Sequence, residues 1–248
     1  QGLYGPADNL DGPAIENKYF SLFFPVMGAK INADIIGKRQ YIPVLEKFLT
    51  DTKRHGDHEW GADIYSTKGA MAAGSFTVKG IRPSWSNIDK LKLKINDAGA
   101  ENTSLSMKFI GFDIGSEKID VNWTVSTHWQ ARWIKHTLTF PDGISDEIKF
   151  GMTKHLPMQN YSKIESTQTL YVVGDQTYPK VEGDLLMGMK AKQDQFQSFF
   201  TDDKNTGLIV LPDKHGVVEV WTTLSWDAEP TPIHKIPNWQ GHLFDDIH

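Results

Sequence analysis

Polar and apolar residues alternate along most of the chain beyond residue 70. The alternating stretches are short and rich in β-branched and aromatic residues, and turn signals such as Asn96-Asp97 and Pro141-Asp142-Gly143 separate them. Such alternation places successive side chains on opposite faces of a strand. We therefore predict a mostly β fold, an antiparallel β-sandwich, with strands over residues 74–81, 91–95, 105–114, 120–140, 148–153, 167–173, 185–191, 207–211 and 217–226.

The N-terminal part of the chain predicts two more strands and one short helix. Residues 15–27 form an aromatic, strand-like stretch, and residues 31–36 form a shorter one that ends at Gly37-Lys38. Residues 41–51 carry apolar side chains at helical spacing. Because Pro43 lies near the start of this pattern, we predict the main helix over residues 43–52.

The sequence predicts a single domain over residues 1–248, because no internal repeat, low-complexity tract or linker divides it. Residues 1–13 are rich in glycine and proline, which predicts an irregular arm. Residues 230–248 contain three prolines and predict a tail that wraps the outside of the sandwich. Gln1 stands where an initiator Met would, so we expect a processed N-terminus and a signal peptide that has been removed.

Composition excludes several classes of partner. Hydrophobic residues make up 39% of the chain and charged residues 23%, which is typical of a folded domain with a core. The formal net charge of −5 provides no basic stripe for nucleic acid. No apolar run approaches the ~20 residues that a membrane-spanning helix needs. The chain has no cysteine, which excludes disulfides and thiolate metal sites.

Charged and aromatic residues gather between glycines in residues 31–74, and this is the first candidate site. Glycine is favoured where backbone turns sharply or closely approaches a ligand, so the segment is suited to the floor of a cleft. For any one of these residues, a polar surface loop is the competing interpretation. The residues of interest are Asp34, Lys38, Arg39, His55, His58, Glu59, Trp60 and Asp63.

A second candidate site follows from the alternation in residues 122–136. One set of alternate positions, from Trp123 to Trp133, is of the buried type. The opposite set contains His128, Gln130 and Arg132 in one row. An imidazole, an amide and a guanidinium together are able to bind hydroxyls and a carboxylate on a concave sheet face. The competing interpretation is that this face meets water.

The sequence lacks the motifs of several common enzyme classes. The sequence has no glycine-rich phosphate loop and no G-x-S-x-G nucleophile motif. His55 and His58 are spaced as two metal ligands would be, but a third ligand would have to come from a distant position such as His128 or His155. We therefore predict no metal site and no cofactor, and keep a metal ion as the minor alternative.

The motifs of the N-terminal third resemble a bacterial β-sandwich family, the domain of unknown function numbered forty-eight sixty-one. Members begin with an E-N strand and a D-x-x-G-K turn, followed by a His, W-G-x-D and a Gly/Ala-rich segment. Ala62 and Ser75 depart from this pattern, which has Met and Gly there. The matching positions are Glu16-Asn17, Asp34, Gly37-Lys38, His58, Trp60-Gly61, Asp63, Gly69 and Ala73-Gly74.

The resemblance implies a mutarotase- or lyase-like sandwich, secreted or periplasmic, encoded among polysaccharide-degradation genes. One relative is described as a dehydratase of oligosaccharides from ulvan. The implied reaction is proton abstraction at C5 of a uronic acid and elimination at C4. We expect His58 as base, with His128, His155 and Tyr161 as candidate acids. The expected substrate-binding residues are Lys38, Arg39, Trp60, Asp63, Gln130 and Arg132.

Three alternatives remain open at this stage. A non-catalytic carbohydrate-binding module would use Trp60, Trp85 and Trp129 as stacking platforms and would need no base. A sugar epimerase or mutarotase would use His and Glu on a concave sheet without elimination. A polysaccharide lyase would cleave the chain internally instead of removing water from an end.

Overall fold

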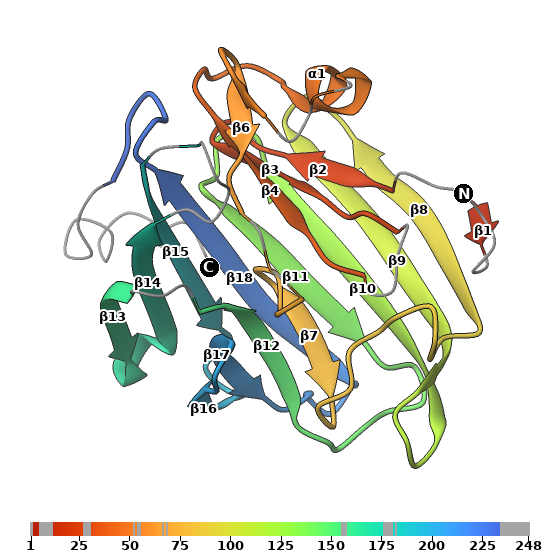
Figure 1. Cartoon of the computed structure of the whole chain (residues 1–248). Coiled ribbons are helices and arrows are strands. Elements are labelled where there is room, and N and C mark those ends of the chain that lie inside the picture. Colours follow the sequence, from red (N-terminus) through yellow and green to blue (C-terminus); the bar gives the residue numbers. More distant parts are fainter. Residues whose placement is uncertain are drawn as a thin grey trace.

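The computed structural model describes residues 2–4, 12–26, 31–51, 53, 56–65, 67, 69–154, 158–175, 181 and 183–233. These residues form three β-sheets, and every pair of named strands is antiparallel (Figure 1). None of the described helices is both long and apolar enough to cross a membrane. The mostly β, antiparallel architecture with one short α-helix confirms the predicted fold class.

The largest sheet has nine strands in the order β1-β8-β9-β10-β11-β18-β15-β14-β13. Strands β8 to β11 and strands β13 to β15 each pair with their neighbours in sequence, and β18 joins these two runs. The strands are β1 (Gly2–Tyr4), β8 (Lys90–Ala98), β9 (Asn102–Asp113), β10 (Lys118–His128), β11 (Trp133–Thr139), β13 (Met158–Ile164), β14 (Thr169–Asp175), β15 (Asp184–Ala191) and β18 (Val217–Trp226).

Two smaller sheets complete the fold. The five-stranded sheet has the order β2-β3-β4-β6-β5, and the four-stranded sheet has the order β16-β17-β12-β7. Helix α1 (Leu45–Thr50) and a single 3₁₀ turn, η1 (Glu165–Thr167), are the helical elements of the described chain. The strands are β2 (Ala14–Glu16), β3 (Phe20–Phe23), β4 (Asp34–Lys38), β5 (Asp57–His58), β6 (Gly61–Asp63), β7 (Ser75–Val78), β12 (Ile148–Thr153), β16 (Phe196–Thr201) and β17 (Asn205–Val210).

The two smaller sheets pack on one face of the nine-stranded sheet and share a hydrophobic core with it (Figure 1). Trp123 of β10 joins all three sheets. Its ring centre lies 5.2 Å from that of Phe24, just after β3, and 5.5 Å from that of Phe76 in β7. Aromatic side chains bury large apolar areas, so this cluster contributes strongly to holding the layers together.

Two of the predicted strands are wrong because each is a hairpin. Within residues 15–27, the side-chain oxygen of Asn17 accepts hydrogen bonds from the backbone N–H groups of Tyr19 and Phe20, at 2.9 and 3.0 Å, and turns the chain between β2 and β3. Within residues 120–140, the chain turns at residues 129–132, where Ala131 N donates to His128 O at 3.0 Å. The alternation read across that turn does not define one continuous sheet face.

Other departures from the prediction involve short elements. Strand β1 lies within the predicted irregular arm and pairs with β8. Strands β5, β6, β13 and β16 were not predicted. Strands β1, β5 and β6 have only two or three residues, too few to show a periodic pattern. The predicted helix corresponds to α1, which is shorter than expected. The C-terminal tail was predicted to wrap the outside of the sandwich. Most of this tail, residues 234–248, lies outside the described residues.

A fully buried histidine lies where the sheets meet. The indole N–H of Trp123 donates to Nδ1 of His136 at 3.3 Å, so Nε2 carries the proton and bonds to the Thr222 hydroxyl at 2.8 Å. Burial lowers the pKa of His136 to about 3. Gly74 passes directly against the ring with φ +78°, and a Cβ there would lie 2.3 Å from His136 Cε1. Position 74 therefore requires glycine for both its φ angle and the close contact.

The low pKa of His136 predicts that the folded protein loses stability in acid. Its folded-state pKa of about 3 lies below the ordinary value of 6.5, so the unfolded chain binds a proton first as pH falls. Stability should therefore decrease between pH 6.5 and about 3, by up to about 1.4 kcal/mol per pH unit. We expect urea unfolding to show a steeper loss of stability with falling pH in the wild type than in His136→Gln. Equal pH dependence in the two proteins would contradict this account, because carboxyl titrations are common to both.

Candidate functional site

The two stretches that hold the predicted site residues meet in the fold. Trp129, in the β10–β11 turn, accepts a backbone hydrogen bond from Lys18 N at 2.8 Å. The Lys38 amine lies 4.8 Å from the centre of the Trp129 ring, and the Arg132 guanidinium lies 3.8 Å from the Tyr19 ring centre. We call this contact between the five-stranded sheet and the β10–β11 turn the junction. It brings Lys38 and Arg132, which the sequence placed in two separate candidate stretches, into one region.

The amine of Lys38 is fully buried in the junction. It donates to Glu16 Oε2 at 2.6 Å, to Asn17 O at 2.6 Å and to Ile42 O at 3.2 Å. Burial lowers the pKa of Lys38, while the Glu16 carboxylate acts in the opposite direction. An ammonium has three N–H donors, and all three are used here. Lys38 therefore ties β4 to β2 and has no donor left for a substrate carboxylate.

Arg132 is also engaged within the protein. Its guanidinium forms an ion pair with the buried Glu229 and donates to Thr231 O at 3.2 Å. Ser225 donates a further hydrogen bond to the same Glu229 oxygen at 2.8 Å. Burial raises the pKa of Glu229, and the charge of Arg132 opposes this shift. Arg132, with a side chain only 10% exposed, thus anchors the segment that follows β18.

His58 lies on the edge strand β5, with its ring stacked on Trp60 at 4.7 Å between ring centres and 9° between planes. Its Nδ1 lies 3.4 Å from a carboxylate oxygen of Asp51, and its Nε2 lies 3.1 Å from Lys53 O. Both ring nitrogens therefore have partners. The side chain is 18% exposed, so a ligand would reach it only by displacing one of these contacts.

The other predicted residues lie apart from one another. Arg39 pairs with Asp57 and donates to His58 O at 2.9 Å, and its guanidinium lies over the Trp226 ring. Asp63 is fully buried in β6. His128 Nδ1 accepts a hydrogen bond from the exposed Gln130 N–H at 3.1 Å. His155 and the side chain of Tyr161 lie outside the described residues, as does His55.

The tryptophans considered as stacking platforms are also occupied. Trp60 stacks on His58, and Trp129 lies beneath the Lys38 amine. Trp85 packs against the core and donates its indole N–H to Val26 O. In the described chain these three rings therefore have partners within the protein.

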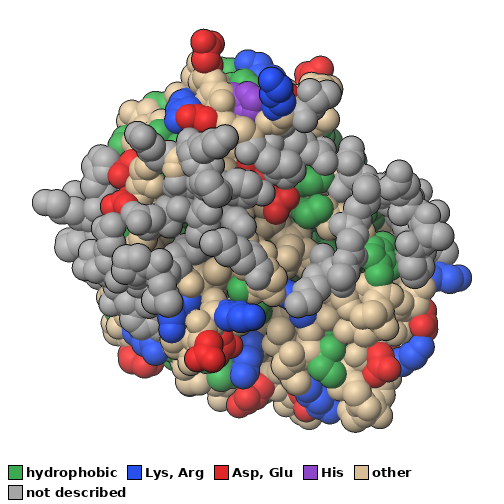
Figure 2. Space-filling view, in the orientation of Figure 1, with side chains coloured by type: hydrophobic (Ala, Val, Ile, Leu, Met, Phe, Trp, Pro, Cys, Tyr) green, Lys and Arg blue, Asp and Glu red, His purple; other side chains and the backbone are tan. Residues whose placement is uncertain are grey.

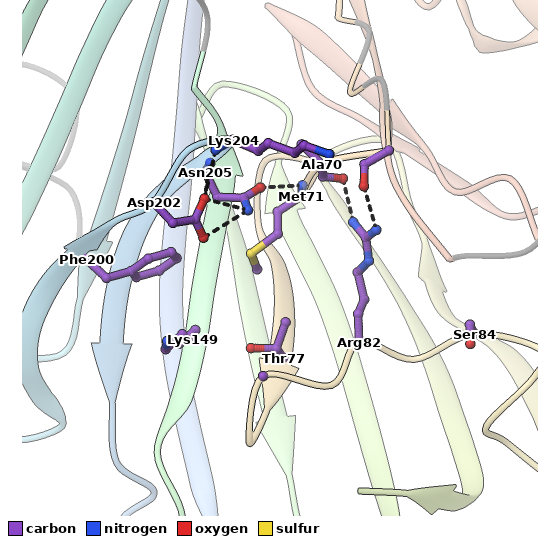
Figure 3. A pocket seen from close by; sticks show the side chains of 12 residues that line it. Ala70, Met71, Thr77, Arg82, Ser84, Lys149, Phe200, Asp202, Lys204 and Asn205 are labelled. Carbon is purple, nitrogen blue, oxygen red and sulfur yellow. Dashed lines mark hydrogen bonds between the residues drawn. The ribbon is translucent and has the colours of Figure 1, made fainter. Parts of the chain in front are cut away.

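A hollow of about 340 Å³ lies over the outer face of the four-stranded sheet, and we call it the sheet pocket (Figure 3). The register of the paired strands determines which side chains form the floor of the pocket. Thr77 of β7 pairs with Lys149 of β12, and Phe200 of β16 pairs with Gly207 of β17. The pocket is lined by Gly69, Ala70, Met71, Thr77, Gly80, Arg82, Ser84, Lys149, Phe200, Asp202, Lys204 and Asn205.

Two glycines make room for the side chains in this pocket. Gly151 and Gly207 face each other on β12 and β17. A Cβ on Gly151 would lie 2.6 Å from Met71 Sδ, and one on Gly207 would lie 2.7 Å from the Phe200 ring. The missing side chains let Met71 and Phe200 lie close to the backbone of the sheet.

The Gly/Ala-rich segment of residues 69–74 forms one rim of the sheet pocket. Met71 N donates to the Asn205 side chain at 2.8 Å, and Thr153 donates to Met71 O at 2.7 Å. Arg82 donates to Ala70 O and, at 3.0 Å, to Gly69 O (Figure 3). The C-terminal end of the resembling motif, although not its histidine, therefore lies at this pocket.

The sheet pocket carries more positive than negative charge. Three cations, Arg82, Lys149 and Lys204, line it together with one carboxylate, Asp202. Figure 2 shows basic side chains gathered with a few acidic ones over this part of the sheet, below the middle of the view. In Figure 3 the Lys204 side chain runs across the top of the pocket toward Ala70.

Three polar groups of the pocket have no partner in the part of the chain that the structure describes. The amines of Lys149 and Lys204 have no hydrogen bond or ion pair there, although Lys149 lies 5.4 Å from the Phe200 ring centre. The hydroxyl of Thr77, a residue only 8% exposed, also lacks a partner. A buried polar group without a partner is costly, so the Thr77 hydroxyl favours a polar ligand. Lys204 is exposed and Lys149 is partly buried, so their amines are open to solvent and available to an anion.

Asp202 is held by its own loop. Its carboxylate accepts hydrogen bonds from Lys204 N at 2.8 Å, from Asn205 N at 2.7 Å and from the Asn205 amide. Burial alone would raise the pKa of Asp202, but these hydrogen bonds and the Lys149 charge hold it below its ordinary value. The carboxylate is therefore a weak base that orders the β16–β17 turn.

The residues of the sheet pocket were not predicted as a site. One usable signal was present: Gly151 and Gly207 interrupt strand-like runs, and a glycine within a strand often marks a close approach of backbone to another group. In addition, no group of three or more His, Cys, Asp or Glu residues in the described chain is arranged to hold a metal ion.

The sequence profile of one family, described as a domain of unknown function (DUF4861), matches residues 3–246 of this chain. The match therefore covers nearly the whole sequence, well beyond the N-terminal motifs. No curated protein matches the chain.

Similarities to solved structures are remote. A heparan sulfate lyase mutant from Pedobacter heparinus has 10% identity and a TM-score of 0.41, covering 88% of this chain and 37% of its own. A heparinase III has 7% identity and a TM-score of 0.42, and the match covers 89% of this chain and 37% of the heparinase. The galactosidase domain of an alpha-galactosidase–sucrose kinase has 10% identity and a TM-score of 0.41, and the match covers 86% of this chain and 40% of that domain. This chain spans less than half of each, and likenesses this remote carry no functional argument.

The contacts of Lys38 predict a structural role that mutation can test. Lys38→Ala leaves the Glu16 carboxylate without its ion-pair partner in a site where the amine was fully buried. Removing one partner of a buried pair typically costs about 3–5 kcal/mol of unfolding free energy. Lys118→Ala is the matched control, because its ion pair with Asp89 is exposed and such pairs contribute little to the free energy of unfolding. Denaturant unfolding measures both.

A different result would restore Lys38 as a ligand-binding residue. If Lys38→Ala kept the wild-type unfolding midpoint and lost affinity for an acidic oligosaccharide, the structural account of Lys38 would be wrong.

Proposed function

We infer that this chain, which belongs to the DUF4861 family, is a carbohydrate-active protein that binds an acidic oligosaccharide in the sheet pocket. Two lysine amines and one buried hydroxyl without partners among the described residues are the observation that carries this proposal. Amines and hydroxyls are donors for the carboxylate and hydroxyl groups of a uronic acid. The Phe200 ring adds an apolar surface on which a sugar ring can pack.

The excess positive charge supports an acidic over a neutral sugar. With Arg82, Lys149 and Lys204 against Asp202, the pocket holds two positive charges more than it holds negative ones (3 − 1 = 2). Arg82 uses its donors on the rim, whereas the two lysine amines are available. A bound carboxylate would offset the repulsion between these amines and gain charge-assisted hydrogen bonds.

We propose elimination at the uronic acid as the reaction. A base takes the proton from C5, the C5–H electron pair forms a C4=C5 double bond, and the C4–O bond breaks. The leaving oxygen takes up the proton that the protonated base returns, so the base is regenerated. The product is water when C4 bears a hydroxyl, and a shortened sugar chain when C4 bears the next sugar. Cations near the carboxylate stabilise the negative charge that develops on it as the C5 proton leaves.

Lysines and no histidine line the sheet pocket. Asp202 is a weak base because hydrogen bonds stabilise its charged form. We therefore propose Lys149 and Lys204 as the groups that neutralise the substrate carboxylate, and we assign no residue of the pocket as the base. His58, expected from the sequence as base, lies on the edge strand β5, and His128, a candidate acid, lies at the end of β10; neither residue lines this pocket.

The first test concerns binding. Lys149→Gln removes the charge and leaves a shorter, neutral polar side chain, so we expect an affinity loss of about tenfold for a uronate oligosaccharide, a change of about 1.4 kcal/mol. Lys94→Gln, which changes an exposed lysine of β8, is the matched control and should bind as the wild type does. Isothermal titration calorimetry measures both affinities. Equal affinity of wild type and Lys149→Gln would refute binding in the sheet pocket.

The second test concerns the reaction. We expect incubation with a uronate oligosaccharide to produce an unsaturated uronate, detected by ultraviolet absorbance, and a carboxyl-reduced substrate to give no product. Mass spectrometry separates the two leaving groups, because dehydration lowers the mass of the intact oligosaccharide by one water. Binding without any product would indicate a non-catalytic carbohydrate-binding module. Anomer exchange without an unsaturated product would indicate a mutarotase. Either outcome overturns the elimination.

A further inference from the structure

The side chain of Asn205 joins two sides of the sheet pocket (Figure 3). Its Oδ1 accepts a hydrogen bond from Met71 N at 2.8 Å, and Met71 belongs to the rim of residues 69–74. Its Nδ2 donates to both carboxylate oxygens of Asp202, at 3.1 and 3.2 Å, in the β16–β17 turn. We call these contacts the Asn205 bridge.

The bridge requires a side-chain amide. The Met71 N–H at one end of the bridge can only donate. At the other end, partial burial would raise the pKa of Asp202, but hydrogen bonds hold that pKa below its ordinary value, so the carboxylate is ionised at neutral pH and can only accept. An amide offers an acceptor and a donor on two separate atoms, so the partners of Asn205 fix its orientation.

The strand pair next to the bridge also holds the rim. Thr153 of β12 and Asn205 of β17 lie opposite each other in the register of the four-stranded sheet. Thr153 Oγ1 donates to Met71 O at 2.7 Å, so this strand pair binds both the N–H and the C=O of Met71. The position of the Met71 backbone over the sheet therefore depends on these two side chains.

The bridge controls the space between Met71 and Phe200. A Cβ on Gly151 would lie 2.9 Å from Met71 Cε and 3.3 Å from Phe200 Cζ, so both side chains flank the same point of the pocket floor. Phe200 directly precedes the turn that contains Asp202 and Lys204. Loss of the bridge would therefore let the rim shift relative to the Phe200 ring and the Lys204 amine.

We propose that Asn205 is a positioning residue of the sheet pocket, which sets the width between Met71 and Phe200 and thereby the fit of an acidic sugar. Asn205 acts through the rim and the β16–β17 turn, without a contact of its own to the sugar. The sugar in this inference rests on the proposed function, whereas the width of the pocket does not.

The test exchanges the two partners of the bridge. Asn205→Asp places a second carboxylate against Asp202. Asp202→Asn places a second amide against Asn205, and the NH₂ group of that amide meets a donor in either orientation. The double variant, Asn205→Asp with Asp202→Asn, restores one amide opposite one carboxylate and keeps the net charge of the wild type.

Asp213→Asn is the matched control for the loss of a turn carboxylate. Asp213 also accepts hydrogen bonds from two backbone N–H groups, those of His215 and Val217, each at 2.9 Å. It does not line the sheet pocket and has no part in the bridge. This variant should therefore behave as the wild type does in both measurements below.

Two measurements separate pocket geometry from sugar binding. The methyl signal of Met71 in nuclear magnetic resonance, assigned with Met71→Leu, needs no ligand and depends on the position of the methyl group against the Phe200 ring. Calorimetric titration with trigalacturonate measures affinity at a temperature where each variant is shown to be folded by its urea unfolding curve. We expect both single variants to shift the Met71 signal and to bind about tenfold more weakly, and the double variant to restore both properties.

Charge alone predicts a different result. Asp202→Asn removes a negative charge, which by itself would strengthen the binding of an acidic sugar. Weaker binding by this variant therefore indicates a change of geometry, and tighter binding would overturn the inference. Unchanged Met71 signals in both single variants, or a double variant no closer to the wild type than they are, would overturn it as well.

The proposed function can fail separately. If trigalacturonate does not bind the wild type, or binds Lys149→Gln equally well, uronate binding in the sheet pocket is refuted. The Met71 signals of the unliganded variants still decide whether Asn205 sets the width of the pocket.

Discussion

The buried contact between Trp123 and His136 is the constraint on which the arrangement of the three sheets depends. The indole donates to a neutral imidazole, and the imidazole bonds to Thr222, so both polar rings are satisfied inside an apolar core. Gly74 lies against the imidazole and donates its N–H to Gly151 O at 3.1 Å. These contacts fix the position of Gly74 in the core. They therefore also fix where residues 69–74, the rim of the sheet pocket, pass from the core to the outer face of the four-stranded sheet.

The cations of the protein divide into two groups by their surroundings. Lys38 and Arg132 are withdrawn from water and have carboxylate partners, Glu16 and Glu229, which compensate their loss of solvation. The amine of Lys149 has no such partner among the described residues and lies over an open pocket. Cations of the first kind hold strands together, and cations of the second kind are available to a ligand. This contrast, more than the number of charges, locates the candidate site.

The sequence predicted the sheets better than the site. Alternation identified strands such as β9 and β10 because each has one face in the core. The same alternation continued through residues 129–132, where the turn hydrogen bonds interrupt the strand. Charge and motif singled out Lys38 and Arg132 as candidate site residues, but pattern alone does not reveal that internal carboxylates already pair with them. The sheet pocket combines side chains from β7, β12 and β16, and the last of these strands was not predicted.

The most direct test of the central claim is a crystal structure of the protein grown with an acidic oligosaccharide. The account predicts electron density for a uronic acid in the sheet pocket, with a carboxylate oxygen at hydrogen-bond distance, about 2.7–3.2 Å, from the amine of Lys149 or Lys204. It also predicts that Lys38 keeps its three internal acceptors when the ligand is bound. A sugar bound against His58 or at the junction against Arg132, with the sheet pocket empty, would contradict the account.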